Sequence, residues 1–204
     1  MAQLRVNPTR MELLRLKKRA ALAKKGHKLL KEKRDGLMQE FLKIVRKAHE
    51  LRREADSGLS EALGHFVMAR ASVPAQAVRM ISELRTQQIE LSVSEKNVMG
   101  VRLPDFRIST SETGENYSSW ETSPELDAGM KSFRLILPKL LELAEVEKSA
   151  QLLAQEIEKT RRRVNALEYV LIPQLSSTIR YIRMKLDEQE RAAIVTTMAV
   201  KENL

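Results

Sequence analysis

The 204-residue chain contains no cysteine, which excludes disulfide bonds and thiolate metal sites. Aromatic residues account for only 4% of it, and there are just 7 glycines and 6 prolines. No run of about 18 apolar residues occurs, so no segment is predicted to span a membrane by itself. Together with 31% charged residues, these shortages favour long, well-solvated helices over a sheet-rich core.

The motifs of nucleotide and metal chemistry are missing as well. Neither a G-x-x-x-x-G-K-S/T phosphate loop nor a G-x-G-x-x-G turn is present. The histidines His27, His49 and His65 do not have metal-ligand spacing. Acidic residues such as Glu142 and Glu145 fall on an expected helix, where a solvated face is the favoured interpretation over a catalytic pair. We therefore predict no catalytic, cofactor-binding or metal-binding residue.

Positive charge is concentrated near the N-terminus. Residues 1–55 hold 17 lysines and arginines against 6 acidic residues, a net charge of +11. The excess is densest from Arg15 to Arg34, where ten basic residues accompany the single acid Glu32. Such a local excess predicts one acidic partner surface. A nucleic acid is the less favoured partner, because no aromatic residues for base stacking are interleaved with these charges.

The same segment carries a regular apolar seam. Eleven of thirteen positions reached by alternate steps of three and four residues from Leu13 are apolar, which is the heptad of a coiled coil. The seam comprises Leu13, Leu16, Ala20, Ala23, His27, Leu30, Arg34, Leu37, Phe41, Ile44, Ala48, Leu51 and Ala55. Its two polar members, His27 and Arg34, are interpreted as residues that fix the register of a helix pair; a ligand or catalytic role for His27 is the alternative.

This N-terminal helix is predicted to begin at a capping box formed by Thr9 and Glu12 and to end near Asp56-Ser57-Gly58. A second long helix is predicted to begin at Ser123-Pro124 and to run to about Val200, bent at Pro138 and Pro173. Its own seam is Leu153, Ile157, Thr160, Val164, Leu167, Leu171, Leu175, Thr178, Ile182 and Leu186. Two consecutive steps of four beside Pro173 form a stutter, which unwinds a supercoil locally.

The two long helices are the candidates to bury each other's seams. We predict a mainly α fold in which they form an antiparallel two-helix coiled coil, with residues 153–200 paired to the N-terminal helix. The predicted organisation is a shaft helix over 1–58, a small head over 59–123 and the long C-terminal helix over 124–204.

The middle of the chain has a different pattern. Short helices are predicted over 59–71 and 74–87, and a loop over 109–122. Between them, alternating residues predict a β-hairpin over about 89–108, with its turn at Asn97–Gly100. The residues that define the hairpin are Val93, Asn97, Met99, Gly100 and Val101.

Several segments, in this order and spacing, resemble the D subunit of the V-type and archaeal-type rotary ATPases over nearly the whole chain. The matching segments are Asn7–Arg10, Leu13–Arg19, Gly26–Asp35, Asn97–Val101, Arg161–Glu168 and Ile172-Pro173. The γ subunit of F-type ATP synthases has a similar helix pair but a larger α/β domain between the helices.

The resemblance implies a non-catalytic central-stalk rotor subunit that transmits torque between a membrane ion-translocating ring and a catalytic nucleotide-binding hexamer. Implied partners are the catalytic and regulatory subunits A and B, the small F subunit of the stalk and a ring adaptor of the C/d type. No cofactor is implied. The location is the cytoplasmic face of the membrane, reached only through the complex. An unrelated coiled-coil adaptor remains the structural alternative.

Within that role, two kinds of residue are expected to contact partners. The basic residues present dispersed charges to the acidic surface of the surrounding ring, and an apolar C-terminal tip turns with little friction. The candidates are Arg10, Arg15, Lys17, Lys18, Lys24, Lys25, Lys28, Arg161 and Arg162 for the charges, and Ile194 and Val195 for the tip.

Overall fold

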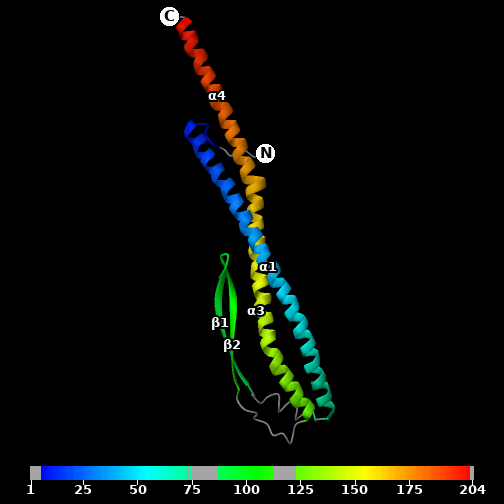
Figure 1. The fold of residues 1–204 in the computed structure, drawn as a ribbon. Coiled ribbons are helices and arrows are strands. Elements are labelled where there is room, and N and C mark those ends of the chain that lie inside the picture. The colour runs from blue at the N-terminus through cyan, green and yellow to red at the C-terminus, as the bar shows by residue number, and fades with distance from the viewer. Residues whose placement is uncertain (1–5, 73, 75–86, 113–122, 203–204) are drawn as a thin grey trace. The chain divides into compact units, whose positions relative to one another are not determined.

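The computed structural model describes residues 6–72, 74, 87–112 and 123–202. The elements in chain order are α1 (Arg10–Ser72), β1 (Gln87–Val98), β2 (Val101–Glu112), α3 (Pro124–Ala166), the π-helical turn η1 (Leu167–Leu171) and α4 (Ile172–Glu202) (Figure 1). The predicted mainly α fold, with long antiparallel helices and a small hairpin, is confirmed. The helix predicted over 74–87 falls almost entirely outside the described residues.

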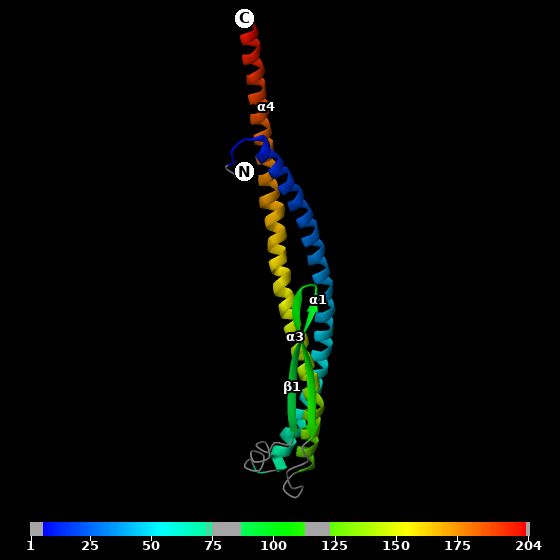
Figure 2. The same cartoon turned by 90° about the vertical axis from the view of Figure 1, so that its left-hand side faces the viewer.

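The chain divides into two compact units. Unit 1 comprises Met1–Gly36 and Ile157–Leu204, and unit 2 comprises Leu37–Glu156. In each unit a part of α1 lies beside a part of the C-terminal helical half, as both views show (Figures 1 and 2). Within the described residues, no helix is long and apolar enough to pass through a bilayer.

Both long helices begin where their capping residues predict. The Glu12 N–H donates to Thr9 Oγ1 at 3.3 Å, and α1 begins at Arg10. The Leu126 N–H donates to Ser123 Oγ at 3.3 Å, and α3 begins at Pro124. Each cap satisfies a backbone donor that the first turn of a helix leaves without an intrahelical acceptor.

In unit 1 the seam of α1 packs on that of α4. Leu16, Leu175 and Ile182 are buried together, and a ring of partly buried side chains surrounds them: Leu13, Ala20, Ala23, Leu171, Ile179 and Leu186. The pairing was expected to reach residue 200, but residues 187–201 are all exposed. The prediction was wrong because α1 begins only at Arg10, whose guanidinium contacts Glu190 at 2.5 Å, so α4 continues past the start of its partner (Figure 1).

In unit 2, α1 does not end at Asp56-Ser57-Gly58; it continues without interruption to Ser72. The predicted separate helix over 59–71 is therefore part of α1. The heptad continues in small residues, because Ala55, Ala62 and Ala69 are all buried at seven-residue spacing. Gly58 lies against α3: a Cβ there would overlap the side chain of Ile136. Its glycine therefore serves close helix packing rather than a helix end.

Aromatic rings fill the space where small residues let the two helices of unit 2 approach. Phe66 of α1 and Phe133 of α3 meet edge to face, with ring centroids 5.5 Å apart and planes at 86°. Gly129 lies beside Phe66, and an added Cβ would stand 3.2 Å from its ring. This edge-to-face geometry is the one that aromatic quadrupoles prefer.

The hairpin is longer than predicted. β1 and β2 pair antiparallel over all twelve residues of each strand, from Val98↔Val101 to Gln87↔Glu112. Met99 and Gly100 form the two-residue connection, with φ of 52° and 86°. Both angles are positive, as the two central residues of a type I′ turn require. The Gly100 N–H donates to Asn97 Oδ1 at 2.9 Å, which closes the turn.

Pro104 lies inside β2 and does not interrupt it, although a proline is typical of a strand break. Pro104 and Phe106 are two residues apart, so their backbone nitrogens face the same edge of the hairpin. The Phe106 N–H donates out of the hairpin to Glu145 Oε2 of α3 at 3.0 Å. The nitrogen of Pro104 therefore also faces away from β1, and no ladder hydrogen bond is lost.

Two glycines of α1 differ in what surrounds them, and this gives a test of the packing in unit 2. A Cβ at Gly26 would meet nothing within 4 Å, whereas one at Gly58 would overlap Ile136. Gly26→Ala is expected to raise stability by about 0.5–1 kcal/mol through helix propensity. Gly58→Ala is expected to give no such gain, because the added methyl group displaces Ile136. Thermal unfolding followed by circular dichroism measures both, and an equal gain from the two variants would contradict this packing.

Candidate functional site

The exposed basic face of α1 in unit 1 is the candidate functional surface. Lys17, Lys18, Lys24, Lys25 and Lys28 are all exposed. Among the described residues none of these five lysines forms an ion pair, although the other basic candidates mostly do. Five ammonium groups within twelve residues, without a carboxylate of their own chain, favour an acidic partner.

Three of the four arginines predicted to contact partners are already paired within the chain. Arg10 pairs with Glu190 across the two helices at 2.5 Å, and Arg15 lies 3.8 Å from Glu12. Arg162 pairs with Glu158 one turn earlier on α3, and Arg161 is exposed beside it. Exposed pairs of this kind contribute about 0–1 kcal/mol, so a partner carboxylate can replace them at little cost.

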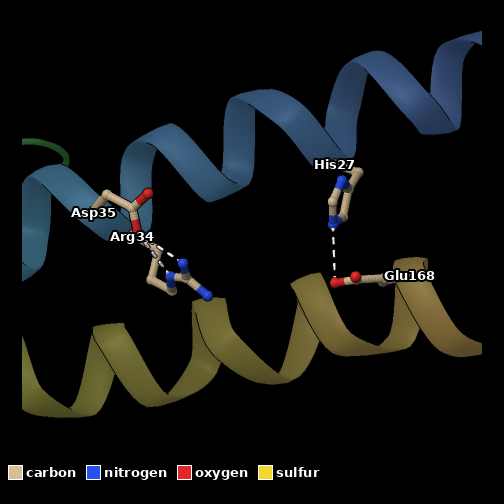
Figure 3. A network of polar contacts seen from close by, with 4 residues as sticks. All are labelled: His27, Arg34, Asp35 and Glu168. Carbon is tan, nitrogen blue, oxygen red and sulfur yellow. Dashed lines mark hydrogen bonds and ion pairs between the residues drawn. The ribbon is translucent and has the colours of Figure 1, made fainter.

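His27 faces across the seam rather than outward. Its Nε2 lies 3.3 Å from Glu168 Oε2, and its side chain is only 22% exposed (Figure 3). His27 comes from α1 and Glu168 from η1, so the contact joins the two helices of unit 1 at one register. The sequence identified His27 as a polar break in the seam, but nothing in the pattern singled out Glu168 as its partner.

Arg34, the second polar seam position, has a local partner. Its Nε and Nη2 donate to Oδ1 of the adjacent Asp35 at 3.0 and 2.7 Å (Figure 3). The sequence interpretation of Arg34, as of His27, is a residue that fixes the register of the helix pair. In the structure it pairs with Asp35 of its own helix, and its side chain remains 30% exposed.

The missing N–H of Pro173 explains the π-helical turn that carries Glu168. Pro173 has no N–H, so it cannot donate to the carbonyl of Tyr169 four residues before it. The preceding Ile172 N–H donates instead to Leu167 O, five residues back. A π turn contains more residues than an α turn. It therefore accommodates the two successive four-residue steps of the apolar seam from Leu167 to Leu175. The stutter predicted beside Pro173 therefore takes the form of a π turn in the structure.

The C-terminal end of α4 is an unpaired helix within the described residues. Ile194 is 55% exposed and Val195 is 64% exposed, and no described side chain covers either. Thr196 and Thr197 direct their hydroxyls back to the carbonyls of Ala192 and Ala193, so their polar groups are satisfied along the helix itself. The surface that remains is mostly apolar.

The hairpin presents its turn and one strand outward. Val93 is 61% exposed and Met99 is 45% exposed, whereas Leu103 of β2 is buried. Glu145 of α3 anchors the strand through the Phe106 N–H. The sequence predicted the turn but not the burial of Leu103. It assigned Glu145 to a solvated face, whereas the Glu145 carboxylate is partly buried and accepts a backbone N–H, a role that has no characteristic spacing in the sequence. In the described part of the chain, no three histidine, aspartate or glutamate residues gather as metal ligands would.

The family profile and the individual relatives found by comparison with known proteins agree on one family. The profile of the ATP synthase D-subunit family matches residues 12–202. The D subunit of the V-type ATP synthase of Acetivibrio thermocellus is 52% identical over 206 residues, covering 99% of this chain and 93% of its own. That of Clostridium novyi is 50% identical, covering 100% and 97%. That of Enterococcus faecalis is 46% identical, covering 98% and 97%.

Replacing His27 with leucine tests whether the polar seam position limits the stability of unit 1. His27→Leu adds apolar surface to a mostly buried site and is expected to raise stability by about 1 kcal/mol. His49→Leu is the matched control, since His49 is exposed and off the seam, and it should change little. Chemical denaturation of both variants measures the difference. A destabilised His27→Leu variant would show that the contact with Glu168 outweighs apolar burial.

Hydrogen exchange tests the anchor of the hairpin. Glu145→Ala removes the acceptor of the Phe106 N–H, so exchange of that amide is expected to accelerate roughly tenfold or more. Glu145→Gln keeps a carbonyl oxygen and should have a smaller effect. Glu147→Ala, which removes an exposed carboxylate from the same helix, serves as the control. Unchanged exchange in Glu145→Ala would mean that the hydrogen bond does not protect this amide.

Proposed function

The chain belongs to the ATP synthase D-subunit family, and on that basis we propose that it is a non-catalytic rotor subunit of the central stalk of a V-type complex. In this role it transmits torque between the membrane ion-translocating ring and the catalytic nucleotide-binding hexamer. The observation that carries the proposal is the row of exposed lysines on α1, Lys17, Lys18, Lys24, Lys25 and Lys28, none of which forms an ion pair within the part of the chain that the structure describes.

A rotor must resist twisting and must also move past several partner faces. The seam between α1 and the C-terminal helical half supports the first requirement, since paired helices with buried apolar contacts are stiffer than a single helix. Dispersed ammonium groups support the second. Each makes a weak, screened contact that forms and breaks readily.

The proposed partners follow from this role. The basic face meets the catalytic and regulatory nucleotide-binding subunits A and B, and other surfaces meet the small F subunit of the stalk and the ring adaptor of the C/d type. The chain reaches the membrane only through the complex, on its cytoplasmic face. The exposed Ile194 and Val195 are proposed as a low-friction apolar tip, because methyl-bearing side chains offer no directional bond that rotation would have to break.

Reversing four charges tests the basic face. Replacing Lys17, Lys18, Lys24 and Lys25 with glutamate is expected to lower the amount of chain that assembles with the hexamer and to uncouple ATP hydrolysis from ion transport. The physical reason is that an acidic ring surface repels the new carboxylates. Assembly is measured by co-purification, and coupling by ATP-driven ion uptake in vesicles.

The matched control replaces the same four lysines with arginine, which keeps every positive charge. That variant should assemble and couple as the parent chain does. Circular dichroism establishes that both variants fold, as expected from the exposure of all four side chains. Normal assembly and coupling in the glutamate variant would refute a bearing role for this face.

A further inference from the structure

A second regular stripe runs along the outer face of α1 in unit 1. Its members follow one another by steps of three or four residues: Met11, Leu14, Lys18, Leu22, Lys25 and Leu29. The apolar members are strongly exposed, Met11 at 83%, Leu14 at 59%, Leu22 at 71% and Leu29 at 65%. A solitary exposed leucine is ordinary, but a row of them at heptad spacing is the pattern that packs against another helix.

The stripe lies opposite the seam that α1 already uses. At about 100° per residue, its six members fall within about 40° of the direction that points away from the seam. Leu16 and Leu13 therefore face α4, while Leu14 and Leu22 face outward. Because the inner seam is occupied by the chain's own helix, the outer stripe is available to a different one.

We propose that the outer stripe of α1 binds a third helix, supplied by a partner protein, that carries an apolar stripe and acidic side chains beside it. The leucines enter the apolar stripe of that helix, and Lys18 and Lys25 pair with its carboxylates. The proposal rests on the function proposed above and names the chemistry of the surface that the nucleotide-binding subunits present to this face.

Charge identifies this occupant over a second copy of the chain. Two copies packed along this stripe would bring Lys18 and Lys25 of each against the strongly basic face of the other, and residues 1–55 alone carry a net charge of +11. Like charges facing one another in a helix pair are destabilising, whereas opposite charges set partner choice. An acidic helix therefore fits where a second copy does not.

The position of the lysines also disfavours a lipid surface. A helix that lies on a membrane keeps its apolar side chains together and places its lysines on the other face or at the edge. Here Lys18 and Lys25 alternate with Leu14, Leu22 and Leu29 along the same narrow stripe. Docking on a bilayer would push both ammonium groups toward the acyl chains, whereas a helix surface has room for each beside an acidic side chain.

Photo-crosslinking in the assembled complex identifies the occupant. The photoreactive residue p-benzoylphenylalanine replaces Leu22 in one sample and, as the control, Leu135, a 77% exposed leucine of α3 in unit 2. The adduct at position 22 is expected on a helical, net acidic peptide of a nucleotide-binding subunit. Any adduct at position 135 is expected on a different peptide. An adduct of position 22 with a basic peptide or a second copy of the chain, or no adduct, would overturn the proposal.

A binding measurement separates the failure of this proposal from that of the proposed function. The triple variant Leu14→Gln, Leu22→Gln and Leu29→Gln should bind the purified nucleotide-binding hexamer at least tenfold more weakly than the parent chain. Its helicity and unfolding midpoint should be unchanged, since all three leucines are exposed. The matched control changes Leu63, Val67 and Leu135, three exposed apolar residues of unit 2, to glutamine and should leave the affinity unchanged.

If the parent chain does not bind the hexamer, the proposed function fails. If the parent binds and the triple variant binds equally well, only the proposal of a third helix fails. Vesicles of phosphatidylcholine and phosphatidylserine form the last arm, with no leucine-dependent binding expected. Binding to these vesicles that the triple variant loses would identify a lipid surface and overturn the proposal.

Discussion

The narrow apolar seam of α1 is the constraint on which the rest of the structure depends. A long helix with a stripe only two residues wide per heptad cannot bury that stripe by itself, and this chain has too few aromatic residues to build another core. The C-terminal helical half therefore has to run antiparallel to α1 in each unit. Leu16 with Leu175 and Ile182 in unit 1, and Ala69 with Leu126 in unit 2, are the two forms of this contact.

The seam is built differently in the two units. In unit 1, leucine and isoleucine side chains fill the space between the helices, and the contact of His27 with Glu168 interrupts them. In unit 2, the repeated alanines of α1 and the two glycines allow closer backbone approach, and Phe66 and Phe133 occupy the remaining space. Small residues need more accurate register than large ones, because a shifted neighbour meets backbone instead of a flexible side chain.

These differences explain which features the sequence could predict. Heptad spacing, the caps at Thr9 and Ser123 and the Met99-Gly100 turn are local patterns with local causes, and they led to the correct fold class and hairpin. Gly58 packs against Ile136, which is 78 positions away, so from the local sequence alone a glycine beside Asp56 and Ser57 has the pattern of a helix end. Pro104 has the local pattern of a strand break, because only the pairing register shows that its nitrogen faces away from β1.

For the candidate site, composition located the basic segment, but a list of charges did not show which of them remain available. Arg10, Arg15 and Arg162 hold carboxylates of the same chain, whereas Lys17, Lys18 and Lys25 hold none among the described residues. Of these three lysines, Lys18 and Lys25 lie on the outer stripe of leucines, on the side of α1 away from its seam. One helix thus has an inner face that fixes it to its own chain through apolar contact. Its outer face combines exposed leucines with lysines that have no ion pair among the described residues, and such a face reaches its lowest free energy only when a partner supplies both apolar surface and negative charge.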